Sequence, residues 1–212
     1  MVLRSPRGTG RAVLRTGLPE RVANLTVGAG PYGQVVTWVE QYPEERLVAY
    51  DPDWPSRFLE VAQLLRRGLG PEWVIEHAGS TSVPGLSAKP VIDLVLRLPE
   101  GQDVTEATRP LLSADWSAPV EVGDHWAIFH PAEGRRAAIG HIFTAVQWPE
   151  AHMRLFARWL RSHPADRQRY EDLKRGLVQQ GIWGSDYTRR KASFVHEIVN
   201  SARRHQGLAP ID

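Results

Sequence analysis

Residues 75–95 read IEHAGSTSVPGLSAKPVIDLV and decide the fold of this chain. The pattern predicts a strand, a hydroxyl-rich turn, a loop and a second strand that carries one carboxylate, Asp93, in its middle. A buried strand carries a charge only where that charge is paired or binds a cation. The short connection therefore predicts that the strands of Glu76 and Asp93 are neighbours in one sheet, with the turn at Ser80 beside Asp93.

Apolar periodicity outside this stretch predicts both strands and helices. Apolar residues recur at helical spacing in a first helix that begins near Trp54, and helical patterns dominate after position 149. A helix between these regions is weakened by Pro110, and Ser185 or Asp186 is the expected cap of the last helix. The β-prone runs are 35–39, 47–50, 73–78 and 90–98, followed by a hairpin over 126–130 and 138–146, and the weak helix covers 103–114. The predicted fold class is α+β, a mixed β-sheet with a helical C-terminal half.

Composition excludes several classes of protein and site. The chain has 212 residues, enough for one sizeable core, and no cysteine, which excludes disulfides and thiolate-bound metals. No apolar run approaches the roughly 20 residues of a membrane span, and a formal charge of +2 gives no strong nucleic-acid signal. We expect a cytoplasmic protein. Only three basic residues are lysines, Lys89, Lys174 and Lys191, although an arginine-rich coding bias alone explains that scarcity.

Residues 1–33 differ from the rest of the chain. They hold five arginines against one acid, Glu20, together with many Gly, Pro and Thr residues. Such a composition offers little apolar surface to bury, and it predicts a flexible or loosely packed arm that is dispensable for folding. No apolar segment precedes a small-residue cleavage site, so a secretory signal is not expected. The predicted folded domain covers residues 34–212.

The central stretch carries a hallmark by which the chain resembles the GrpB family of bacterial proteins. The matching residues are His77-x-Gly79-Ser80-Thr81-Ser82-Val83-Pro84-Gly85-Leu86-x-x-Lys89-Pro90-x-x-Asp93. Further matches within residues 46–204 are Tyr50-Asp51-Pro52-x-Trp54-Pro55, Tyr170-x-x-Leu173-Lys174 and Tyr187-x-x-x-Lys191-x-x-Phe194. The resemblance implies a nucleotidyltransferase-like fold. It also implies a link to dephospho-CoA kinase, because GrpB-like domains occur fused to that enzyme.

The turn after the first strand suits a phosphate group. Gly79 lets a ligand approach the backbone, and the hydroxyls of Ser80, Thr81 and Ser82 match phosphate oxygens. Nucleotidyltransferases build a phosphate and metal site from a Gly-Ser turn and an acidic residue on the next strand. The resemblance therefore implies that Asp93 holds a metal ion, with Mg²⁺ as the candidate. Lys89, just before the second strand, either pairs with this carboxylate or contacts a phosphate.

The candidate site departs from the nucleotidyltransferase pattern in its ligands. A second carboxylate usually stands two residues after the first, but this position is Val95, which argues against a two-metal site. The family's His-x-His pair on a later strand is reduced to Ile139 and His141, so that His141 is the candidate general base. Glu76 is a further candidate metal ligand and His77 a candidate substrate contact. Because they are adjacent, they point to opposite faces of a strand and at most one reaches the metal.

Tyr187 and Lys191 lie one turn apart on the last predicted helix, as candidate substrate contacts. Lys191 interrupts an apolar stripe, and it either reaches the phosphate site or extends along the core to solvent. The leading hypothesis is a nucleotidyltransferase-type enzyme that binds a nucleotide or phosphorylated substrate at the Gly-Ser turn and Asp93. The alternatives are a non-catalytic nucleotide- or metabolite-binding accessory module, or a divergent biosynthetic enzyme with acyl or amide-bond chemistry on the same fold.

Overall fold

The structure is a computed structural model that describes residues 47–132 and 135–211. These residues lie within one compact unit, Glu40–Asp212. The arm predicted at 1–33 and the β-prone run at 35–39 fall outside the described residues. None of the helices in the described part combines the length and the apolar character that crossing a membrane requires.

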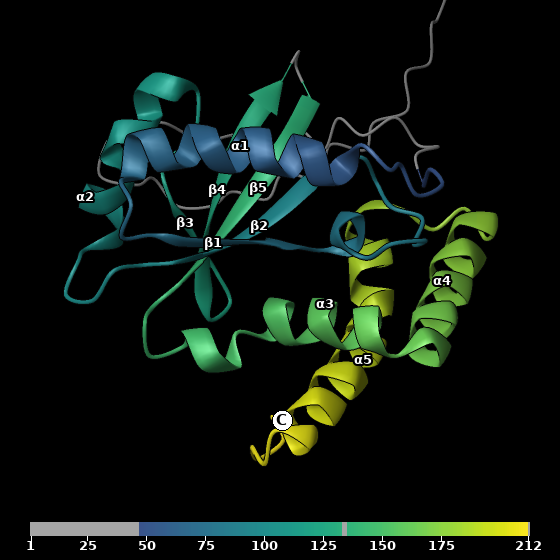
Figure 1. Cartoon of the computed structure of the whole chain (residues 1–212). Helices are drawn as coiled ribbons and strands as arrows, with labels where there is room; N and C mark the ends of the chain where they lie inside the picture. Colours follow the sequence, from purple (N-terminus) through teal and green to yellow (C-terminus); the bar gives the residue numbers. More distant parts are fainter. Residues whose placement is uncertain (1–46, 133–134, 212) are drawn as a thin grey trace, which may run out of the picture. The chain divides into compact units, whose positions relative to one another are not determined.

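A five-stranded mixed sheet forms the centre of this unit (Figure 1). β2 and β5 run parallel, and the other neighbouring strands are antiparallel. The predicted adjacency of the first two strands is confirmed, with Glu76 opposite Val95 and Ala78 opposite Asp93. The strand order is β1-β2-β5-β4-β3, and the strands are β1 Val74–Ala78, β2 Ile92–Arg97, β3 Val120–Val122, β4 His125–Ala132 and β5 Arg135–Phe143.

One face of the sheet is covered by α1, Trp54–Leu69, whose apolar side packs on alternate residues of β1 and β2. Leu65 of α1, for example, shares a core with Ile75 and Leu94. The helix predicted over 103–114 divides into α2, Val104–Thr108, and the 3-10 helix η2, Arg109–Ala114. The division follows from a proline in the first turn of η2, which cannot donate a backbone hydrogen bond.

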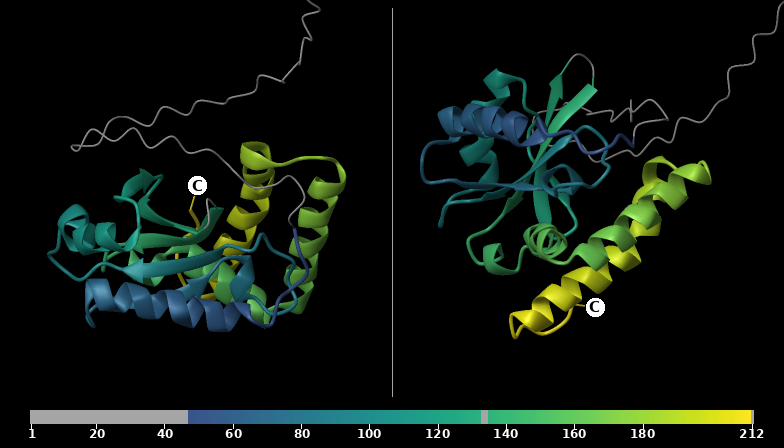
Figure 2. Two further views of the ribbon diagram at one scale, coloured as in Figure 1. Left: turned by 90° about the horizontal axis from the view of Figure 1, so that it is seen from above. Right: turned by 45° about the vertical axis from the view of Figure 1, so that its right-hand side comes forward.

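The other face of the sheet and the C-terminal half are helical. Figure 2 shows the green-to-yellow helices on the side of the sheet away from α1. Val95 and Phe143 pack there on Trp148, and α3, α4 and α5 share a second core with the loop after β1. The predicted fold class, α+β with a mixed sheet and a helical C-terminal half, is confirmed. The elements are η3 Trp148–Glu150, α3 His152–Ser162, α4 Pro164–Gln179 and α5 Gly184–His205.

Three local predictions differ from the structure. The run 47–50 forms an isolated bridge between Val48 and Ala88 instead of a strand, because its partner is a loop rather than a sheet edge. β3 was not predicted, since three residues are too few to show a period. α5 begins at Gly184, ahead of the expected caps, and no side chain caps its first turn.

Gly79 brings the hydroxyl-rich turn into contact with Asp93. Its φ of 64° and ψ of −175° lie in a region that is essentially open only to glycine. The 3-10 helix η1, Ser80–Ser82, follows directly. A Cβ atom on Gly79 would lie 2.1 Å from Oδ2 of Asp93, so turn and carboxylate touch. The prediction that the Ser80 turn lies beside Asp93 is therefore confirmed.

Replacing Gly79 with alanine is expected to lower the free energy of unfolding by about 2–3 kcal/mol, through backbone strain and a clash with Asp93. Gly85→Ala is the matched control, because Gly85 also has a positive φ, 83°, but a Cβ there would meet nothing within 4 Å. The control should cost only the strain of the backbone, about 1 kcal/mol. Urea unfolding of both variants measures the difference, and equal losses would contradict the close packing of Gly79 on Asp93.

Candidate functional site

A pocket of about 250 Å³ opens where η1, β2, β5, α4 and α5 meet. Its lining combines hydroxyl, acidic, basic and aromatic side chains. All three lysines of the chain line it, one from the loop before β2, one from α4 and one from α5. The pocket brings together six of the predicted site residues, namely Ser80, Thr81, Lys89, Asp93, Tyr187 and Lys191.

The hydroxyl-rich turn offers two side chains to the pocket and uses the third to close itself. Ser82 Oγ donates a hydrogen bond of 2.7 Å to the carbonyl oxygen of Gly79 and does not line the pocket. Thr81 Oγ1 donates to the carbonyl oxygen of Val91 at 3.3 Å. It lines the pocket, as Ser80 does. Gly79 and Ser82 therefore shape the turn, and Ser80 and Thr81 face the cavity.

Tyr170 of α4 contacts the hydroxyl-rich turn through Ser80. Its phenol shares a hydrogen bond with Ser80, and burial raises the pKa of Tyr170 to about 12, so that the phenol keeps its proton at neutral pH. The sequence showed Tyr170 only within the family match Tyr170-x-x-Leu173-Lys174, and no spacing rule connected it with the turn. Its role in positioning Ser80 is visible only because α4 packs against η1.

Asp93 lies where β2 is flanked by both of its neighbours. It pairs with Ala78 of β1 and Ile139 of β5, and its side chain is 25 % exposed. Its Oδ1 lies 3.7 Å from Nε2 of His141, which follows Ile139 by two residues on β5. The carboxylate of Asp93 therefore has a histidine neighbour and also lines the pocket.

Lys191 and Lys89 reach the pocket beside aromatic rings. Burial lowers the pKa of Lys191 to about 8, while the charge of Asp93 acts to raise it. The Nζ atom of Lys191 lies 4.3 Å from the ring centroid of Tyr187, and that of Lys89 lies 5.3 Å from the same centroid. Tyr187 therefore offers both ammonium groups a cation–π contact.

Lys174 is the site residue that the sequence singled out least clearly. Its side chain is 1 % exposed, and its ammonium donates to the carbonyl oxygen of Ser87 and pairs with Glu171 at 3.3 Å. Burial lowers the pKa of Lys174 to about 8, an effect that Glu171 opposes. Glu171 also accepts hydrogen bonds from the backbone N–H and the hydroxyl of Ser87, at 3.0 and 2.5 Å. This cluster ties α4 to the loop that carries Lys89.

The residues around Asp93 fit one divalent cation and do not fit two. Asp93 supplies a single carboxylate to the pocket lining, which is enough to attract one Mg²⁺ ion that keeps water among its other ligands. Val95, at the place of a second carboxylate, is buried in the core beneath α3. Asp93, with His141 beside it, would hold the ion, which would supply positive charge to a bound phosphate.

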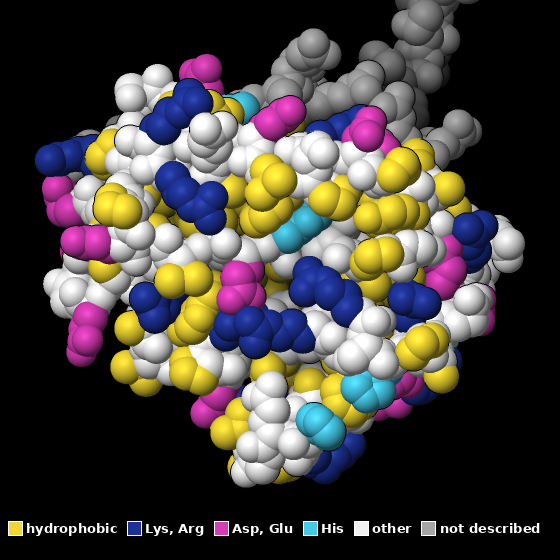
Figure 3. All heavy atoms as spheres, viewed as in Figure 1, with side chains coloured by type: hydrophobic (Ala, Val, Ile, Leu, Met, Phe, Trp, Pro, Cys, Tyr) yellow, Lys and Arg dark blue, Asp and Glu magenta, His cyan; other side chains and the backbone are white. Residues whose placement is uncertain are grey.

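Glu76, the second predicted metal ligand, does not line the pocket. Its oxygens accept hydrogen bonds from Arg154 at 2.9 and 3.1 Å and from Arg158 at 3.1 and 3.2 Å. Burial acts to raise the pKa of Glu76, but the two arginines hold it below its usual value. Figure 3 shows basic side chains gathered over the region where α3 lies in Figure 1. The carboxylate thus anchors α3 on β1 instead of reaching the site of Asp93.

His77, predicted as a substrate contact, is likewise outside the pocket lining. Its ring stacks on Phe58 of α1 with 4.7 Å between centroids, and its Nε2 lies 3.0 Å from Thr81 Oγ1. Burial, with the charge of Arg161, lowers the pKa of His77 to about 4, so the ring is neutral at pH 7. It supports the turn through Thr81 from the face that α1 covers.

Comparison with known proteins shows which proteins this chain is similar to. A UPF0157 protein of Halalkalibacterium halodurans is 33% identical over 188 residues, which cover 86% of this chain and 91% of that protein. A dephospho-CoA kinase of Mycolicibacterium paratuberculosis is 29% identical over 163 residues, which cover 64% of this chain and 40% of the kinase.

Among solved structures, the GrpB protein of Enterococcus faecalis has a TM-score of 0.66 and 26% sequence identity, and the match covers 76% of this chain and 98% of that one. The family model described as GrpB protein matches residues 44–201. Because this match covers well over half of the chain, the chain belongs to the GrpB protein family.

Proposed function

We propose that the pocket binds the phosphate groups of a nucleotide or another phosphorylated metabolite, and that the protein acts on it as a nucleotidyltransferase-type enzyme with one divalent ion. The observation that carries this proposal is that the chain has only three lysines and that all three line one pocket. Ammonium groups beside hydroxyls are the donors that phosphate oxygens require. Three lysines placed at random in the chain would rarely all line the same pocket.

The basic, hydroxyl and acidic side chains of the pocket would make different contacts with the ligand. Lys89 and Lys191 would neutralise phosphate oxygens, while the hydroxyl of Ser80 would donate a hydrogen bond to them. Asp93 would hold the divalent ion against the same phosphate. His141, at 3.7 Å from Asp93, would accept a proton from the attacking group.

A non-catalytic accessory module is the second candidate, and Val95 is the observation that favours it. Without a carboxylate at this position the second metal ion of a two-metal transfer has no ligand on β2. The similarity to part of a dephospho-CoA kinase agrees with an accessory role. Release of pyrophosphate or phosphate from a bound nucleotide separates the two candidates, since an accessory module binds without turnover.

The proposal predicts that phosphate binding weakens as the pH rises through about 8. Lys191 carries its charge below this pH, because burial lowers its pKa to about 8, and it loses the charge above it. Lys191→Met is therefore expected to weaken binding about tenfold near pH 7 and to reduce the further loss towards pH 9. The measurement is a calorimetric titration with ATP, ADP, inorganic phosphate and adenosine in the presence of Mg²⁺.

The matched control is Arg190→Met, which removes a positive charge from the adjacent, exposed position of α5 and leaves the pocket unchanged. It should bind as the unaltered protein does. Adenosine binding as tightly as ADP, or equal losses in the two variants, would contradict recognition of phosphate by this pocket.

A further inference from the structure

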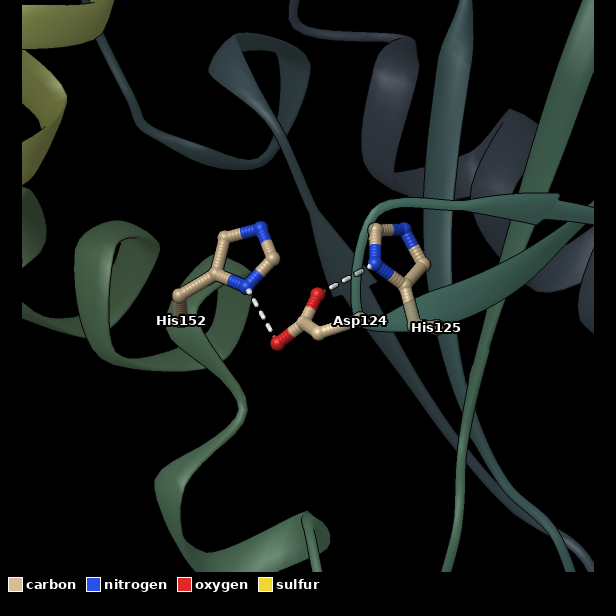
Figure 4. Close-up of side chains that lie close together, drawn as sticks. All are labelled: Asp124, His125 and His152. Carbon is tan, nitrogen blue, oxygen red and sulfur yellow. Dashed lines mark hydrogen bonds and ion pairs between the residues drawn. The ribbon is translucent and has the colours of Figure 1, made fainter.

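A second group of polar side chains lies at the start of α3, outside the pocket lining. Figure 4 shows Asp124, from the turn before β4, between His125 of β4 and His152 of α3, with both rings turned towards its carboxylate. Asp124 Oδ1 lies 2.9 Å from Nδ1 of His125, and its Oδ2 lies 3.8 Å from Nδ1 of His152. The potential ligand atoms of all three residues lie within 4.8 Å of one another.

The contact between Asp124 and His125 has the length of an ordinary hydrogen bond, whereas the contact between Asp124 and His152 does not. A separation of 3.8 Å is too long for a hydrogen bond between His152 and Asp124. It is close to the roughly 3.3 Å between neighbouring ligands of a tetrahedral ion with bonds of about 2 Å. Two imidazoles and one carboxylate are also a donor set of catalytic zinc sites, which keep the fourth position open.

Packing holds the two imidazoles in place. Phe143, which is 1 % exposed, stacks on His125 with 4.6 Å between centroids and meets His152 edge-on at 5.6 Å. Gln147 donates a hydrogen bond of 2.5 Å to the carbonyl oxygen of Asp124 and so fixes the turn. The ligands are therefore positioned by rigid neighbours, which reduces the ordering cost of binding an ion.

We propose that Asp124, His125 and His152 bind one divalent transition-metal ion, with zinc as the best match to their donor set. The site is distinct from the ion expected at Asp93 and does not depend on the proposed function of the pocket. It lies at the junction of the β3–β4 turn and α3. A bound ion would therefore join the sheet to the helical half of the protein.

The proposed ion would also determine which nitrogen carries the hydrogen in His141, the histidine beside Asp93. His125 Nε2 lies 3.0 Å from Nδ1 of His141, whose Nε2 faces Asp93. A metal on Nδ1 of His125 leaves the hydrogen on Nε2, which then donates to His141, so that His141 turns an N–H towards Asp93 and cannot act there as the base proposed above. Without the metal, His125 Nδ1 donates to Asp124, His141 Nδ1 donates to His125, and His141 presents a bare Nε2 to Asp93.

The test is a zinc titration of the untagged full chain after removal of metals with a chelator. We expect one zinc per chain, and an affinity at least tenfold weaker in both His152→Ala and Asp124→Asn. His205→Ala is the control, because this exposed histidine lies at the end of α5, outside the cluster, and it should bind zinc normally. Cobalt should give a tetrahedral absorption spectrum without a thiolate band, since the chain has no cysteine.

Two further measurements keep the outcome unambiguous. Circular dichroism checks that the variants fold, and His152→Asn serves if His152→Ala does not. Nitrogen NMR of the imidazole rings should show the hydrogen of His141 moving to Nε2 when zinc is added. Unchanged affinity in His152→Ala and Asp124→Asn would overturn the proposal. Loss of zinc binding in Asp93→Asn but not in His152→Ala would also overturn it, because the ion would then lie in the pocket.

Discussion

Asp93→Asn is expected to weaken Mg²⁺-dependent nucleotide binding by about 100-fold, or roughly 2.7 kcal/mol, and to leave the protein folded. Asparagine keeps the shape of the side chain and removes its charge, so a divalent ion loses its main attraction. The charge of Asp93 also acts to raise the pKa of Lys191. In the variant, Lys191 should therefore lose its charge at a lower pH, so that phosphate binding begins to weaken at a lower pH as the solution is made more basic. Titration of ATP with and without Mg²⁺, together with a thermal melt, measures these effects.

Asp186→Asn is the control for this variant, since Asp186 is exposed on α5 and pairs with Arg189 at the surface. If Asp93 serves chiefly as the partner of a buried lysine, Asp93→Asn would instead lower the free energy of unfolding by on the order of 3 kcal/mol. Its effect would then be the same with and without Mg²⁺. A stable variant that binds nucleotide normally would refute both roles.

Glu171→Ala is expected to lower the free energy of unfolding by about 3–5 kcal/mol, measured by urea unfolding. The substitution leaves the buried ammonium of Lys174 without its carboxylate and removes the acceptor for the N–H and hydroxyl of Ser87. Glu197→Ala is the control, because its ion pair with Arg169 joins two side chains that are each 51% exposed. Such a surface pair contributes about 0–1 kcal/mol.

The double variant Glu171→Met with Lys174→Met tests the cause of that loss. Replacing both charges with apolar side chains removes the unpaired ammonium, so part of the lost stability should return. A double variant as unstable as Glu171→Ala would show that lost packing, not the stranded charge, is responsible.

The stabilising effect of Glu171 also depends on pH. Its hydrogen-bond and ion-pair partners hold the pKa of Glu171 below the usual value, against the effect of burial. The contribution of Glu171 to the free energy of unfolding is therefore complete above the ordinary glutamate pKa, and it is lost as the pH falls through the lowered pKa.

Sequence alone predicted the strand pair β1–β2 and the contact between the Ser80 turn and Asp93. The reason is local, because a short connection permits few arrangements and a carboxylate inside an apolar strand must find a partner. Strand alternation also predicted that Glu76 and His77 point to opposite faces. It did not predict that neither residue lines the pocket. That result depends on Arg154 and Arg158 of α3, which bind Glu76, and on Phe58 of α1, which stacks on His77.

Only the tertiary structure decided which distant residues meet. Lys89, Lys174 and Lys191 come from a loop and two helices, and no spacing rule connects them; they converge because α4 and α5 pack on the loop after β1. Asp124 and His125 meet His152 because Phe143 and Trp148 pack the start of α3 against the end of the sheet. Residue patterns encode periods and short connections, whereas helix packing far along the chain depends on the shape of the whole core.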